Sequence, residues 1–138
     1  MGIARNAWEQ SNLDTYGWIS HHVIGVGYHT HGLMEGFGHH DFEIVPALIP
    51  AQMANSIFNT LVEKIKDGEV LKQGVEYTDL LDDGVKIMFY LKPDMHREDK
   101  EVLRVIISDI HNNLNIDNPS DFVAKQINCK PQWDEEII

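Results

Sequence analysis

The chain has 138 residues, of which 43% are hydrophobic and 24% are charged, and its formal net charge is −11 at pH 7. This length and composition favour one globular domain over residues 1–138, with residues 1–15 as an N-terminal arm and residues 130–138 as a tail. The negative charge argues against a nucleic-acid partner, because contact with a phosphate backbone needs clustered Lys and Arg. No apolar run is long enough to span a membrane, so no membrane partner is expected.

The cysteine content and the first residues indicate a compartment. Cys129 is the single cysteine, which excludes an internal disulfide and favours a reducing environment. The first residues lack the apolar segment of a signal peptide. We therefore expect a cytoplasmic protein. Apolar strands on an acidic protein also predict a homo-oligomer, in which a second copy protects an exposed strand edge.

The N-terminal half has the pattern of a sheet. Residues 17–24 and 26–33 are rich in β-branched and aromatic side chains, which predicts two strands separated by Gly25. Residues 34–40 contain two glycines and are expected to form a loop. Residues 41–48 are apolar and predict a buried third strand.

The clearest helix is predicted from Pro50 to Gly68. Proline suits the first helical position, and a glycine suits the residue after the end. Apolar residues recur at intervals of three and four on one face of this helix: Ala54, Ile57, Phe58, Leu61, Val62 and Ile65. An acidic excursion with a short edge strand is expected over residues 69–83. Asp83-Gly84 then predicts a turn into a strand over residues 85–91.

A second helix is predicted from about residues 96–99 to Asn113. Its apolar stripe consists of Leu103, Ile106, Ile107, Ile110 and Leu114. A short third helix or turn is expected around residues 122–127. Strands in a block, followed by helix, strand and helix, favour an α+β fold, with a single mixed or antiparallel sheet and two main helices packed on it.

Histidines concentrate in residues 17–48, which hold six of the eight in the chain. Imidazole binds metals, shuttles protons and forms hydrogen bonds with ligands. In the second predicted strand, His29 and His31 share one face and Tyr28 and Thr30 share the other. Adjacent His21 and His22 must face opposite sides of the first strand, so they cannot both join one site.

We expect this region to bind a small polar ligand without needing a cofactor. Aromatic faces suit a nucleobase, and side-chain donors with glycine-rich backbone suit a phosphate, so a nucleotide-like molecule is the predicted partner. The expected ligand-binding residues are Tyr28, His29, Thr30, His31, Phe37, His39, His40 and Asp41.

Two other functions stay open at this point. His29, His31, His39 and His40 are an alternative set of ligands for zinc or another divalent metal, which would make the protein a metal-dependent hydrolase with Glu35 as a base. No fixed metal signature such as H-E-x-x-H is present. The acidic charge alone suggests an inhibitor that binds a basic protein. Each histidine also has a purely structural alternative, so whether the chain is an enzyme is left open.

The same region carries a family resemblance over roughly residues 16–115. It rests on Gly17-Trp18, Tyr28, Thr30-His31-Gly32-Leu33, Gly38-His39 and the helix over residues 50–68. This pattern resembles the bacterial and phage family called domain of unknown function 4262. The sequence departs from it at His40-Asp41, where that family has Pro-Glu. The resemblance implies a compact α/β fold and a shared site near residues 30–41. It also suggests an anti-defence phage protein that sequesters a host signalling nucleotide.

Overall fold

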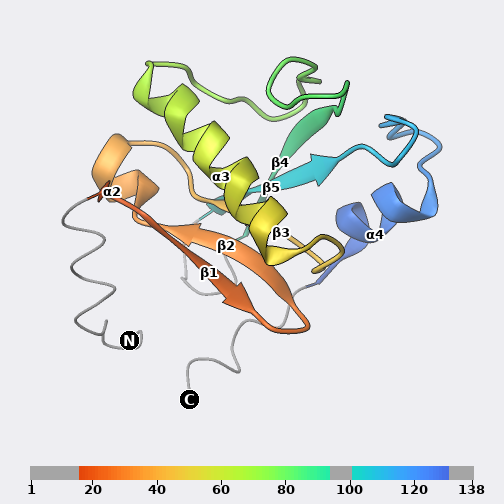
Figure 1. The fold of residues 1–138 in the computed structure, drawn as a ribbon, viewed down its shortest axis with the longest axis horizontal. Coiled ribbons are helices and arrows are strands. Elements are labelled where there is room, and N and C mark those ends of the chain that lie inside the picture. Colours follow the sequence, from red (N-terminus) through yellow and green to blue (C-terminus); the bar gives the residue numbers. More distant parts are fainter. Residues whose placement is uncertain (1–15, 94–100, 131–138) are drawn as a thin grey trace.

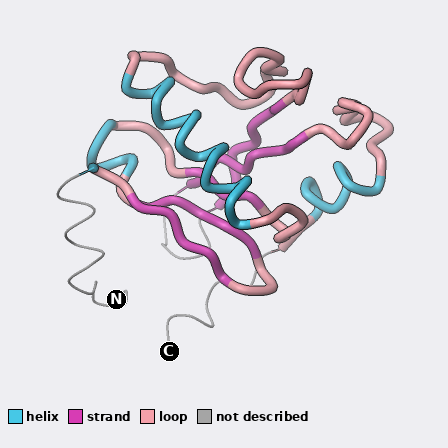
Figure 2. The backbone as a smooth tube through the Cα atoms, in the orientation of Figure 1, coloured by secondary structure: helices cyan, strands magenta, loops and turns pink. Residues whose placement is uncertain are grey.

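The computed structural model describes residues 16–93 and 101–130, so the expected arm (1–15) and all but the first residue of the tail lie outside the described residues. Figures 1 and 2 show one mixed sheet with helices packed on it. Its strand order is β1-β2-β3-β5-β4, and β3 and β5 pair in parallel while the other described pairs are antiparallel. The strands are β1 (Ile19–Val23), β2 (Gly27–His31), β3 (Phe42–Ile44), β4 (Ile87–Pro93) and β5 (Glu101–Ile107). The predicted α+β class with a single sheet is confirmed.

The described helices are α2 (Leu33–Phe37), α3 (Ala51–Lys66) and α4 (Asp121–Asn128). The predictions of α3 and of the short helix near the C-terminus are confirmed. Within the described part of the chain, no helix combines the length and the apolar character needed to cross a membrane.

The two predicted N-terminal strands form a hairpin around residues 24–26. Gly25 has a φ of +79°, which glycine adopts at little cost, and it allows the tight reversal between the strands. The register pairs Ser20 with Thr30 and His21 with His29. Both strands are therefore confirmed with narrower bounds, and their pairing fixes which side chains share a face.

Helix α3 lies across β1 and β2 and supplies much of the main core (Figure 1). Its expected apolar stripe is buried in full, from Ala54 to Ile65. These side chains pack with core residues of the sheet such as Phe42 and Phe89. After the helix, Gly68 has a φ of +91° and its N–H donates to the carbonyl of Ile65 at 3.0 Å. The predicted stop is thus where the helix ends.

The loop expected over residues 34–40 is wrong for its first four residues, because Leu33–Phe37 form helix α2, and residues 38–40 are a loop as expected. Gly32 and Gly38 lie at its two ends with φ values of +96° and +67°. The N–H of Gly38 donates to the carbonyl of Met34 at 3.0 Å. Of the two glycines that suggested a loop, Gly36 lies within this helical turn and Gly38 ends it with a left-handed backbone.

The third strand is shorter than expected, with Phe42–Ile44 in place of residues 41–48. Pro46 has no N–H to donate to a neighbouring strand, so the ladder cannot continue through it. Gly27 lets β2 approach this strand closely, because an added Cβ would lie 2.5 Å from the carbonyl oxygen of Ile44.

The helix predicted over residues 96–113 is also wrong, because Glu101–Ile107 form strand β5. Its predicted start falls partly in residues 94–100, which are outside the described ranges. The apolar residues have helical spacing by coincidence, since β5 is buried on both faces. Leu103 and Ile107 join the main core and Ile106 joins a second cluster. A strand covered on both sides has a continuous apolar run that periodicity cannot separate from a buried helix.

The outer edge of β4 is covered by the acidic excursion that precedes it. Tyr77 and Ile87 exchange two backbone hydrogen bonds of 2.7 and 2.9 Å. The expected edge strand in residues 69–83 is therefore a single bridge. The turn at Asp83-Gly84 is confirmed by φ values of +63° and +76°. Because the chain covers this edge itself, the edge gives no reason to pair with a second copy, and homo-oligomerisation stays a prediction.

Helix α4 packs on the face of the sheet opposite α3. Val123 joins Ile106 and Leu114 in the second cluster. The Gln126 amide accepts a hydrogen bond from the N–H of Ile107 at 2.8 Å and donates to its carbonyl at 2.9 Å. This pair of bonds fixes α4 against the end of β5.

Leu61→Ala should lower the free energy of unfolding by about 2–5 kcal/mol, because Leu61 is fully buried and its truncation leaves a cavity under the sheet. Met53→Ala on the same helix is the control, since Met53 is 51% exposed and its loss should cost less than about 0.5 kcal/mol. Urea denaturation measures both. Equal losses in the two variants would contradict the assigned face of α3.

Candidate metal centre

The β1–β2 hairpin presents two chemically different faces. On the α3 side, the Ser20 hydroxyl donates to Asn55 Oδ1 at 2.9 Å, and the Tyr28 hydroxyl donates to the carbonyl of Ile49 at 2.6 Å. Side chains alternate along a strand, so the immediate neighbours of Ser20 and Tyr28 in the two strands point the other way. His21 and His29 therefore project from the opposite face of the hairpin.

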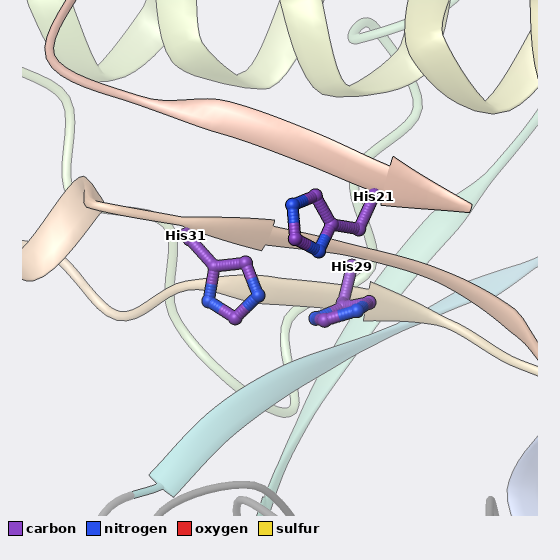
Figure 3. Close-up of side chains that lie close together, drawn as sticks. All are labelled: His21, His29 and His31. Atoms are coloured by element: carbon purple, nitrogen blue, oxygen red, sulfur yellow. The ribbon is translucent and has the colours of Figure 1, made fainter. Parts of the chain in front are cut away.

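Three histidines meet on that face, as Figure 3 shows for His21, His29 and His31. The ring centroids of His29 and His31 are 4.5 Å apart, and that of His21 lies 5.3 Å from His29 and 4.7 Å from His31. One ring nitrogen from each can be chosen so that all three lie within 4.8 Å of one another. His29 is buried and the other two are half-buried. We call this set the histidine triad.

The spacing of the triad is close to that of a metal centre. Zinc–nitrogen bonds of about 2.0–2.1 Å in a tetrahedral site place ligand nitrogens about 3.4 Å apart. Metal binding would therefore require the ring nitrogens to move closer than the 4.8 Å within which they lie here. His21, His29 and His31 each take part in further interactions within the protein.

The triad differs from the metal set expected from the sequence, because His21 takes part and His39 and His40 do not. His22 faces the α3 side, where its ring lies 4.6 Å from that of Tyr28. The sequence of the hairpin does contain a signal for the participation of His21. A reversal centred on Gly25 places residue 21 opposite residue 29, so the pairing could have been derived from the turn.

His39 has a structural role on the other side of the sheet. Its Nδ1 lies 2.9 Å from the His40 carbonyl and its Nε2 accepts a hydrogen bond from the N–H of Leu71 at 3.2 Å. A carbonyl only accepts and a backbone N–H only donates, so these partners select the neutral tautomer with the proton on Nδ1. Burial lowers the pKa of His39, and this effect outweighs the hydrogen bond to the His40 carbonyl, which raises the pKa. The imidazole thus stays neutral and anchors the segment after α3.

Thr30 and Asp41 form a buried network that joins three elements. The Thr30 hydroxyl donates to Asp41 Oδ1 at 2.8 Å and accepts from the N–H of Phe42 at 2.9 Å. Asp41 Oδ1 also accepts from the N–H of Leu33 at 3.1 Å. One carboxylate oxygen therefore holds the start of α2 against β2 and β3.

The remaining expected ligand residues are also placed by structural contacts. Tyr28 is buried in the main core, and Phe37 packs against that core from α2. Nδ1 of His40 lies 3.3 Å from the carbonyl of Glu101. Of the eight residues expected to bind a ligand, the structure brings His29 and His31 together, and it places Tyr28 and Thr30 on the opposite face of β2.

Comparison with known proteins gives no match, either to a family model, to a curated protein or to a solved structure. The resemblance to the domain of unknown function 4262 family therefore stays a prediction.

Asp41→Ala should lower the free energy of unfolding by about 1–3 kcal/mol, because it leaves the buried N–H of Leu33 without its acceptor. Asp41→Asn keeps an acceptor oxygen and should cost less. Chemical denaturation of both variants tests this. A wild-type stability for Asp41→Ala would contradict the structural role given to this carboxylate.

The lowered pKa of His39 predicts a dependence of stability on pH. Below about pH 6.5, the ordinary pKa of histidine, the unfolded chain binds a proton at His39 that the folded chain resists. The stabilisation is fully present above that pH and is lost as the pH falls towards the lowered folded pKa. Denaturation between about pH 7 and 5 should show a steeper decline for wild type than for His39→Gln, and parallel curves would refute the assignment.

Proposed function

We propose that this protein binds a divalent transition-metal ion, with zinc the best suited, through His21, His29 and His31. The observation that supports this is the convergence of three imidazoles on one sheet face, with ligand atoms within 4.8 Å of one another. Two ligands come from one strand and the third from its hairpin partner, so backbone hydrogen bonds hold all three in register. A site built on strands is more precise than one built on loops.

The chemistry of the ligand set favours zinc with an open position. Imidazole nitrogens suit zinc, copper, iron and nickel, while calcium and magnesium prefer oxygen ligands. Three protein ligands leave the fourth tetrahedral position for water or substrate, which is the arrangement of catalytic rather than structural zinc. Neutral imidazoles also leave the charge of the ion uncompensated, which favours ionisation of a bound water. Metal-dependent hydrolysis is the reaction class that this arrangement supports.

A bound metal would also allow so acidic a chain to hold an anionic ligand. With a net charge of −11, the chain as a whole repels anions, so a phosphate-bearing molecule needs a local positive charge. The open position of a bound metal supplies one. In this proposal the small polar, nucleotide-derived ligand is held by the metal on the triad. Thr30, His39 and Asp41 instead maintain the fold. Sequestration of a host nucleotide stays a prediction.

Wild-type protein stripped of metal should bind about one equivalent of Co²⁺ or Zn²⁺, with Co²⁺ giving a visible absorption band typical of a low-coordinate site. His21→Ala, His29→Ala and His31→Ala should each weaken binding by more than about 100-fold, because removal of a direct ligand costs more than the 10–100-fold typical of outer-shell changes. Titration against a chromophoric chelator measures the affinity.

His22→Ala is the matched control, since His22 lies on the same hairpin but on its α3 side. It should bind metal as wild type does. Equal affinities in all four variants, or no uptake by the folded wild-type protein, would reject the triad as a metal centre.

Hydrolysis of phosphoesters should appear with the metal-loaded wild type and disappear with a chelator.

A further inference from the structure

The histidine triad is continued across the sheet by two buried charged residues. In the β2–β3 register the partner of His29 is Glu43, and in the β3–β5 register the partner of Glu43 is Arg104. Partners in register project from the same face, so the three side chains form one row beside His21. Their exposures are 4% for His29, 2% for Glu43 and 4% for Arg104.

Arg104 holds the Glu43 carboxylate in place. Its Nε donates to Glu43 Oε2 at 2.7 Å. Its Nη1 donates to the carbonyls of Gln126 at 3.2 Å and Cys129 at 2.7 Å, at the C-terminal end of α4. A guanidinium that donates hydrogen bonds on both sides fixes the position of the Glu43 carboxylate.

Stability alone does not account for this ion pair. Two buried charges are costly to remove from water, and proteins with well-packed apolar residues at such sites are often equally stable or more so. The fold uses apolar residues at neighbouring positions on the same face of the sheet. Ile19 is buried beside the triad, and Ile106 is buried two residues after Arg104 on β5. The particular result of Glu43 is a carboxylate held in a fixed position next to His29.

We propose that Glu43 is a positioning residue for the metal centre, an inference that rests on the proposed function. Side chains of directly opposed strand residues have Cβ atoms about 4.5–5.5 Å apart, which brings the carboxylate into reach of the His29 ring. A carboxylate beside a metal-binding imidazole fixes the orientation of the ring and increases its basicity. Arg104 in turn ties this carboxylate to α4.

The experiment is a Co²⁺ titration of the full chain with and without this charge. Glu43→Gln keeps the shape and an oxygen for Arg104, and we expect metal affinity about 10–100-fold below wild type. The Co²⁺ absorption band at saturation should also shift, because His29 loses its orienting partner. Glu76→Gln is the matched control. It removes the same charge from an exposed ion pair with Lys86 at 3.4 Å, and its affinity should stay within about twofold of wild type.

A second variant separates metal binding from folding. Glu43→Gln leaves Arg104 buried without its counter-ion and should lower the melting temperature. Glu43→Gln/Arg104→Met removes both charges, so it should be more stable than Glu43→Gln alone. It should still bind metal at least about 10-fold more weakly than wild type. Wild-type affinity and an unshifted band in either folded variant would overturn the role of Glu43 while leaving the triad as the metal site. Failure of wild type to bind Co²⁺ would instead overturn both proposals.

Discussion

The alternation of side chains along β2 is held by hydrogen bonds on one of its faces. The Tyr28 hydroxyl is bonded to the chain before α3, and the Thr30 hydroxyl is bonded to Asp41 and to the N–H of Phe42. A slip of one residue would exchange the two faces of the strand, breaking these bonds and placing His29 in the main core. The polar contacts under α3 therefore determine that the histidines gather on the other side of the sheet.

The parts of the fold that sequence patterns predicted correctly are those with a local signal. Helix α3 has an apolar stripe with clear ends, and the hairpin has β-branched strands on both sides of a glycine. The prediction for β5 was wrong because burial on both faces removes the alternation of apolar and polar residues that distinguishes a strand. The prediction missed helix α2 because Gly36 and Gly38, one inside the helix and one at its end, are also typical of loops. In each case the missing information was tertiary.

Some residues of the candidate site could likewise be predicted from local sequence patterns, and others depend on tertiary structure. That His29 and His31 share a face follows from the strand period alone, and the structure shows the two rings in contact. The third member, His21, depends on the register of the hairpin. Glu43 and Arg104 depend on pairings between β2, β3 and β5, which no local pattern encodes. His39 and Asp41 are close to the triad in sequence, but their ring nitrogen and carboxylate oxygen are used by backbone groups of neighbouring segments.

The parallel pairing of β3 with β5 has a consequence for how the molecule folds. Glu43 and Arg104 are separated by 61 positions along the chain, whereas the hairpin that carries the triad closes over a few residues. Contacts between distant residues require the closure of long loops and form slowly, while hairpins form within about 1–10 μs. The imidazoles should therefore come together early in folding. Their charged neighbours should arrive only when α3, β4 and β5 have joined the sheet.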